Sequence, residues 1–247
     1  MPTTIDAQGI YYAQVNEQIR DLVRRGENEI TLTNVTGQRY IGGGIQSPDL
    51  KITVRGVAGE DLAAFMEGPT IEVMNNAQDG VGNTMNDGKI VIHGLAGDVV
   101  GYGMRGGKIF IRDDVGYRVG IHMKGFKDKQ PVLVVGGCAG DFFGEYQAGG
   151  CLVLLGLTNS RKFSVVGDYC GTGMHGGVMY IRGGFKENYL GREVKHFDLT
   201  NADIAKLKPI LEEFACIFGI TEDIYDFHRY RKIIPVSTRP YGQLYAY

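Results

Sequence analysis

The chain has no tryptophan, and its four cysteines are too widely spaced to form a CxxC pair. Zinc sites and iron–sulfur clusters need closely spaced cysteines, so neither is indicated on this chain. We interpret Cys138, Cys151, Cys170 and Cys216 as buried thiols.

Long apolar runs and an excess of one charge are also missing. The formal net charge is −2, which gives no reason to expect binding to nucleic acid. The N-terminus lacks the basic-then-apolar pattern of a secretory signal, and no segment is apolar for long enough to span a membrane. We therefore expect a cytoplasmic protein that binds neither nucleic acid nor membrane.

Glycine, by contrast, is abundant, with 38 residues in 247, and it bounds a short apolar run that repeats. Ile52, Ile71, Ile90 and Ile109 each begin such a run, and they are spaced 19 residues apart. The runs are β-branched or aromatic and too short for helices, so they predict strands. A fixed period of this length is typical of a solenoid.

If each repeat forms one coil, equivalent strands lie side by side about 4.8 Å apart and pair in parallel. A coil of about 19 residues does not fit the hexapeptide rhythm of left-handed helices, and parallel crossovers favour the right hand. We therefore predict an all-β fold, a right-handed single-stranded parallel β-helix.

Methionine occupies one position of this repeat, eight residues after the small residue that follows each strand. A shared position in successive coils predicts a ladder of side chains that points into the core. The ladder comprises Met66, Met85, Met104, Met123 and Met174, and Gln147 takes the same position in one coil.

The composition divides the chain into three parts. Residues 1–28 contain an apolar stripe at helical spacing and predict a helix that caps the solenoid. Residues 29–184 form the β-helix, with insertions near residues 126–130 and 157–164. Residues 185–247 predict a helical and extended tail, in which Thr200 and Asp203 resemble a capping box, Pro209 interrupts the helix and Gly219 ends it.

Two segments match the G-x-G-x-x-G pattern of dinucleotide-binding loops. Both occupy the same position of the repeat, and neither is followed by a helix-length segment, so we interpret their glycines as structural corners. These are Gly101, Gly103 and Gly106 in one coil and Gly171, Gly173 and Gly176 in another.

A row of mostly acidic residues follows a neighbouring position of the repeat. Close carboxylates can perform acid/base chemistry or bind a cation, as in β-helix enzymes that act on polysaccharides. Alternatively, each aspartate accepts backbone N–H groups of its own corner. The row comprises Glu60, Asp79, Asp98, Tyr117, Asp141 and Asp168. We favour the structural interpretation, and the histidines show no metal spacing, so we assign no catalytic, cofactor-binding or metal-binding residue.

Lysines form a looser row before the strands. Lys51, Lys89 and Lys108 share this position, and we interpret them as part of a solvated face.

The outward middle position of the strands is apolar in five consecutive coils, and such a row needs a cover. This cover is either the chain's own C-terminal tail or another subunit. We expect the tail to leave part of the row uncovered, as a surface for partner chains. We call this row the outer strip, and it comprises Val91, Phe110, Val134, Val153 and Tyr180.

The glycine-rich coils resemble the GXGXG domain, which is found at the C-terminus of the glutamate synthase large subunit and in one of the subunits of formylmethanofuran dehydrogenase. The segments IDAQG (residues 5–9), VNEQIR (15–20), NVTGQRYIG (34–42) and KIIPV (232–236) favour the glutamate synthase version. Because the chain starts at its own methionine and has no room for further domains, it resembles the stand-alone β-helix of a split glutamate synthase.

This resemblance implies a non-catalytic scaffold subunit in glutamate biosynthesis and nitrogen metabolism. Its partners would be a glutaminase-type amidotransferase subunit and a synthase subunit that carries FMN and an iron–sulfur cluster, with no cofactor on this chain. A homo-oligomer is a further option. The alternatives are a scaffold like the β-helix of formylmethanofuran dehydrogenase and a carbohydrate-active β-helix enzyme that uses the acidic row.

Overall fold

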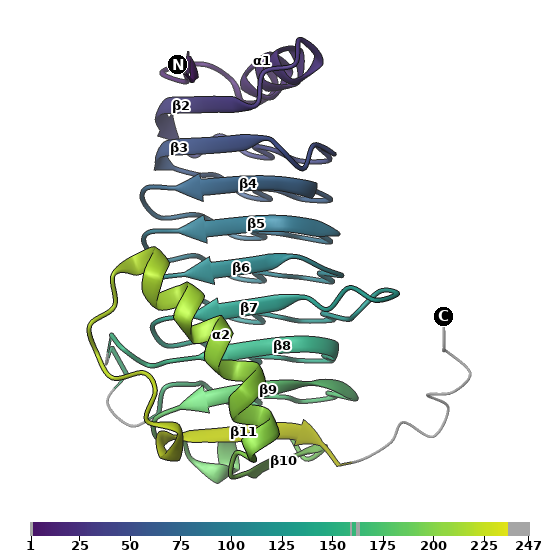
Figure 1. Cartoon of the computed structure of the whole chain (residues 1–247), viewed down its shortest axis with the longest axis vertical. Coiled ribbons are helices and arrows are strands. Elements are labelled where there is room, and N and C mark those ends of the chain that lie inside the picture. Colours follow the sequence, from purple (N-terminus) through teal and green to yellow (C-terminus); the bar gives the residue numbers. More distant parts are fainter. Residues whose placement is uncertain (1, 159, 162–163, 237–247) are drawn as a thin grey trace.

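A computed structural model describes residues 2–158, 160–161 and 164–236 of the chain. Its strands form one eleven-stranded sheet that runs the length of the molecule (Figure 1). The strands up to β9 pair in parallel with their neighbours in the chain, and the last two join in antiparallel fashion, in the order β9-β11-β10. The fold is thus the predicted all-β parallel β-helix.

The described elements have the following bounds. The solenoid strands are β1 (Thr3–Asp6), β2 (Glu29–Thr36), β3 (Lys51–Val57), β4 (Glu67–Val73), β5 (Asp87–Ile92), β6 (Lys108–Ile111), β7 (Val132–Val135), β8 (Ala148–Leu154) and β9 (Gly176–Arg182). The helices are α1 (Tyr12–Arg24) and α2 (Asn201–Phe218), and the closing strands are β10 (Val194–Phe197) and β11 (Tyr230–Pro235).

The strand register follows the sequence repeat. Ile52 pairs with Ile71, Ile71 with Ile90, and Ile90 with Ile109, so each 19-residue step is one coil. The longer step to Leu133 keeps the same register, because Ile109 pairs with Leu133. The extra residues there leave the coil as a tight turn in which the Phe126 N–H donates to the Lys129 carbonyl at 3.0 Å.

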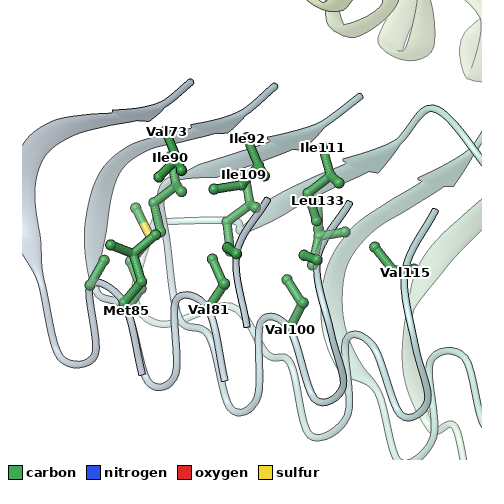
Figure 2. Close-up of a cluster of buried hydrophobic side chains, with 14 of the residues drawn as sticks. Val73, Val81, Met85, Ile90, Ile92, Val100, Ile109, Ile111, Val115 and Leu133 are labelled. Carbon is green, nitrogen blue, oxygen red and sulfur yellow. The ribbon is translucent and has the colours of Figure 1, made fainter. Parts of the chain in front are cut away.

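The core lies between the strands and the turns that return each coil. Val81 and Val100 on the turns face Ile90 and Ile109 on the strands (Figure 2). The methionine ladder is part of this core, with all five side chains at most 1% exposed. Gln147, which replaces methionine in one coil, is also buried, and its side-chain amide donates to the Gly149 and Gly150 carbonyls.

The N-terminal end is covered by α1, which lies beyond β2 in Figure 1. Val15 and Ile19 of this helix are buried in the core cluster. The Asn16 side chain donates to the Arg39 carbonyl at 2.8 Å, which ties the helix to the first coil. The strand β1 adds a parallel partner to β2, an element that the sequence pattern does not predict.

At the other end, α2 runs diagonally across the face of the sheet (Figure 1). Thr200 and Asp203 form the predicted capping box, and Gly219 ends the helix in the left-handed conformation. The predicted interruption at Pro209 is wrong, because α2 is one helix through this residue. Pro209 lies on the exposed side, where water can satisfy the carbonyl that its ring leaves without a donor.

Candidate functional site

The six predicted corner glycines lie on the turns that lead into β6 and β9, and Gly176 is the first residue of β9. Gly101, Gly103, Gly171 and Gly173 have φ between 57° and 72°, which glycine adopts without a steric penalty. Gly106 differs, because a Cβ there would lie 2.4 Å from the Asn86 carbonyl oxygen of the preceding coil. A strand, and not a helix, follows each glycine-rich segment, so neither has the helix N-terminus that holds a pyrophosphate.

The acidic row bonds one coil to the next. The Asp98 N–H donates to the Asp79 carboxylate at 2.8 Å, and the Tyr117 N–H donates to Asp98 at 2.8 Å. Asp141 accepts the Asp168 N–H in the same way at 2.9 Å. These three carboxylates thus satisfy backbone groups, as the structural interpretation predicts, but the bond goes to the following coil and not to the aspartate's own corner.

The outer strip lies beneath α2. Its five members are at most 4% exposed and form one apolar cluster with Leu207, Leu211 and Phe214 of the helix. The rings of Phe110 and Phe214 are 6.5 Å apart between centroids. The chain's own tail is therefore the cover, and the expectation that part of this strip stays open as a partner surface is wrong. The helix is long enough to span these coils because Pro209 does not break it.

Ion pairs fix α2 over the strip. Glu213 of the helix lies 2.5 Å from both the Lys89 and the Lys108 ammonium groups. Burial opposes ionisation of Glu213, but the two lysines outweigh it and hold its pKa below the ordinary value. These two lysines therefore anchor the helix, a role that goes beyond the solvated face expected from the sequence.

Asp203 joins three elements at the start of α2. Its carboxylate accepts the Tyr180 hydroxyl of β9 at 3.0 Å and pairs with the Lys232 ammonium of β11 at 2.7 Å. Burial alone would raise the pKa of Asp203, but Lys232 and Thr200 hold it well below the ordinary value. This carboxylate therefore locks the helix onto the C-terminal strands.

The cysteines and histidines do not gather into a site. Cys138 and Cys170 are buried and Cys151 is half-buried, whereas Cys216 is exposed, so the prediction of four buried thiols is correct for two of them and wrong for Cys216. Burial raises the pKa of Cys170 to about 12, which keeps this thiol unreactive. Across the described part of the chain, no three His, Cys, Asp or Glu residues are placed to hold a metal ion. No helix in that part is long and apolar enough to cross a membrane.

Exposed aromatic side chains gather on the turns opposite the strands. Phe65 is 57% exposed, Tyr102 41% and Tyr169 58%. Phe142, Tyr146 and the His122 imidazole lie among them and make ring contacts within the group. We call this surface the aromatic face, and it comprises Phe65, Tyr102, His122, Phe142, Tyr146 and Tyr169.

The backbone holds most of these side chains in an unusual conformation. Phe65, His122, Tyr146 and Tyr169 have φ between 51° and 61°, a region that residues other than glycine and asparagine rarely adopt. Closure of each coil imposes this conformation, because the same turn positions have positive φ in coil after coil. The side chains therefore project from fixed points of a rigid frame.

Ring stacking orders the aromatic face further. The His122 and Tyr146 rings are 5.2 Å apart and nearly parallel, and the Tyr102 ring meets His122 edge-on at 5.9 Å. Gly173 makes room for this stack, because a Cβ at that position would lie 2.3 Å from the Tyr146 ring. Arg118 covers the Phe142 ring at 4.5 Å, which adds a cation–π contact.

This surface is not among the sites predicted from the sequence, although the repeat contains a signal for it. Phe65, His122 and Tyr146 each stand one residue before the inward-pointing position of the methionine ladder. This position is exposed in Phe65 and His122 and half-buried in Tyr146, so an aromatic residue directly before the methionine position indicates a ring on the outer surface.

Comparisons with known proteins identify the family. The model of the GXGXG motif family matches residues 12–236. An uncharacterized protein of Methanocaldococcus jannaschii is 48% identical over 249 residues, which cover 98% of this chain and 95% of that protein. The NADH glutamate synthase of Schizosaccharomyces pombe is 29% identical over 159 residues, which cover 61% of this chain and 7% of that enzyme.

The match of the family model spans most of the chain, and it agrees with the glycine corners and the coil register described above. The chain therefore belongs to the GXGXG motif family and resembles, over part of its length, a glutamate synthase.

Proposed function

We propose that this chain is a non-catalytic structural subunit of a cytoplasmic glutamate synthase complex, and that its aromatic face is the surface on which partner chains dock. The observation that carries the proposal is the exposure of Phe65, Tyr102 and Tyr169 on a rigid frame. Aromatic side chains are enriched at protein interfaces, and ordering them in advance lowers the entropic cost of binding.

The proposed partners follow from the similarity to glutamate synthase. One is a glutaminase-type amidotransferase subunit that releases ammonia from glutamine. The other is a synthase subunit with FMN and an iron–sulfur cluster that converts 2-oxoglutarate to glutamate. In this proposal the β-helix carries no cofactor and fixes the spacing of the two enzymes, and it serves glutamate biosynthesis and so nitrogen metabolism.

Two other functions are less well supported. A carbohydrate-active enzyme would need free carboxylates, but Asp79, Asp98 and Asp141 use theirs to accept backbone N–H groups. A scaffold like the β-helix of formylmethanofuran dehydrogenase has the same kind of coils, but the N-terminal segments favour the glutamate synthase version. The similarity to the Schizosaccharomyces enzyme agrees with this preference.

The test is co-expression of the tagged chain with the glutaminase-type and FMN-type chains of the same genome. Phe65→Asn and Tyr169→Asn remove two exposed rings, and asparagine tolerates the positive φ of both positions. Tyr225→Asn is the matched control, because Tyr225 is 40% exposed and lies outside the aromatic face.

We expect the double variant Phe65→Asn/Tyr169→Asn to fold with an unchanged melting temperature and to recover less of the partner chains, whereas Tyr225→Asn recovers the normal amount. Equal recovery with all variants would contradict the assignment of the aromatic face. Loss of a homo-oligomer without any effect on partner recovery would assign the face to self-association instead.

A further inference from the structure

A hollow of about 340 Å³ lies at the C-terminal end of the solenoid. It forms where the end of β9 meets the segment that precedes β11, and Leu155, Leu157 and Val165 supply its apolar wall. This volume lies in the range of small-molecule sites, of the order of 300–1,000 Å³. The family similarity assigns nothing to this hollow.

The charged side chains described around the hollow are mostly cationic. They are Arg161, Arg182, Arg229 and a single carboxylate, Glu222. Two further carboxylates of this segment, Asp223 and Asp226, accept the Tyr225 and His228 N–H groups, and their negative charges favour the charged form of Arg182. The lining of the hollow itself therefore contains more guanidinium groups than carboxylates.

Arg182 is the unusual member of this group, because it is only 6% exposed. Its guanidinium donates to two neutral acceptors, the Leu155 carbonyl at 3.2 Å and the Asp223 carbonyl at 3.1 Å. Its Nε is buried without a hydrogen-bond partner. Buried charges in proteins are normally paired, so a cation held by two carbonyl groups is incompletely compensated.

The neighbouring arginine increases this imbalance. Burial lowers the pKa of Arg182, and the positive charge of Arg229 lowers it further, whereas the negative charges of Asp223 and Asp226 offset only part of this lowering. Arg229 is exposed and also lines an adjoining hollow with His196, His228 and Arg231. An anion in this place would compensate both guanidinium groups at once.

We propose that this hollow binds a small organic molecule through an oxyanion group, a carboxylate or a phosphate, which the guanidinium groups of Arg182 and Arg229 recognise. Guanidinium groups bind both oxyanions with paired, charge-assisted hydrogen bonds. The apolar wall would contact the carbon skeleton of the ligand. The proposal does not depend on the partners proposed above, since it concerns this chain alone.

The test uses the full chain and three probes, namely inorganic phosphate, the five-carbon dicarboxylate glutarate, and sodium chloride at matched ionic strength. Binding is measured by calorimetry, and the melting temperature is measured with each probe. Arg229→Gln removes an exposed guanidinium and should leave the fold intact. Arg192→Gln is the control, because Arg192 is also exposed and does not line the hollow.

We expect phosphate or glutarate to bind saturably and to raise the melting temperature above the value in sodium chloride. Arg229→Gln should weaken that binding at least about tenfold, the loss of one charge-assisted pair, and Arg192→Gln should leave it unchanged. Arg182→Lys should also weaken oxyanion binding, because lysine keeps the positive charge but lacks the planar set of N–H donors of a guanidinium group. The probe that binds more tightly identifies the oxyanion.

Three results would overturn the proposal. One is a melting temperature that responds to all three probes equally, and another is equal loss of binding in Arg229→Gln and Arg192→Gln. The third is the absence of saturable binding of both oxyanions. If Arg229→Gln then also recovers less of the partner chains, the hollow belongs to an acidic side chain of a partner.

Discussion

Replacement of Phe110 by alanine tests whether α2 seals the outer strip. The Phe110 side chain is fully buried between the sheet and the helix, where it contacts the Phe214 ring. Removal of a buried phenylalanine ring costs about 3–5 kcal/mol of unfolding free energy. For a chain of this length, that loss lowers the melting temperature by about 6–20 °C.

The assay combines urea unfolding with hydrogen exchange of the α2 amides. Phe110→Ala should destabilise the isolated chain and should increase exchange in α2 before it does so in the central strands, because the helix loses the ring that contacts Phe214. Phe214→Ala should behave in the same way. The double variant should show a coupling energy of about 0.5–1.5 kcal/mol, the range measured for aromatic pairs.

Leu95→Ala is the control, because this side chain is 46% exposed and should cost less than about 0.5 kcal/mol. The reasoning would be refuted if Phe110→Ala cost as little as the control and left exchange in α2 unchanged. The strip would then be open in solution, and α2 would not be its cover.

Three other predictions concern the helix anchor, the core and the cofactors. Asp203→Asn should cost about 2–3 kcal/mol at neutral pH through loss of the charged bond to Lys232. Folding lowers the pKa of Asp203, so its contribution to the free energy of unfolding is complete above the ordinary pKa of 3.8 and disappears as the pH falls through the folded pKa. In acid, the free energies of unfolding of Asp203→Asn and the natural chain, measured in urea, should therefore converge. Met104→Lys should lower the free energy of unfolding by more than about 3 kcal/mol and Arg105→Ala by less than about 1 kcal/mol, because only the methionine is buried in the core. Equal losses of melting temperature in the two variants would contradict the inward position of the methionine ladder. The glycine corners of the isolated chain should bind neither FMN nor NAD in absorbance and calorimetric measurements, and micromolar binding of either that persists in Arg229→Gln would contradict the structural role of these corners.

The solenoid could be predicted from the sequence because the same residue types recur at the same positions of each repeat. The 19-residue spacing of Ile71, Ile90 and Ile109 is the strand register of the structure. The capping box at Thr200 and the stop at Gly219 were also predictable, since both depend on residues within a few positions of each helix end.

The parts that escaped prediction depend on contacts between distant segments. No local sequence pattern shows whether the tail covers the outer strip or leaves it to a partner. The position of the tail depends on the contacts of Glu213 with Lys89 and Lys108, which are far from it in the sequence. The sequence predicts an extended segment in the tail, but it does not predict that β10 and β11 pair in antiparallel fashion at the open end of the sheet, because that pairing joins segments far apart in the chain.

The aromatic face and the hollow around Arg182 also differ in how far local sequence predicts them. The aromatic face has a partial signal in the repeat, whereas the positive φ of residues such as Phe65 and Tyr146 is imposed by coil closure and not by residue type. The burial of Arg182 has no local signal at all, because it results from the loop around Asp223 closing over the end of β9.

The most direct test of the scaffold proposal is purification of the native complex from the source organism with a tag on this chain. We expect a glutaminase-type chain and an FMN-containing synthase chain to co-purify in fixed ratio, with glutamine-dependent glutamate formation in the complex and none in this chain alone. Recovery of the chain alone or only as a homo-oligomer, or catalytic activity of the isolated chain, would contradict the account.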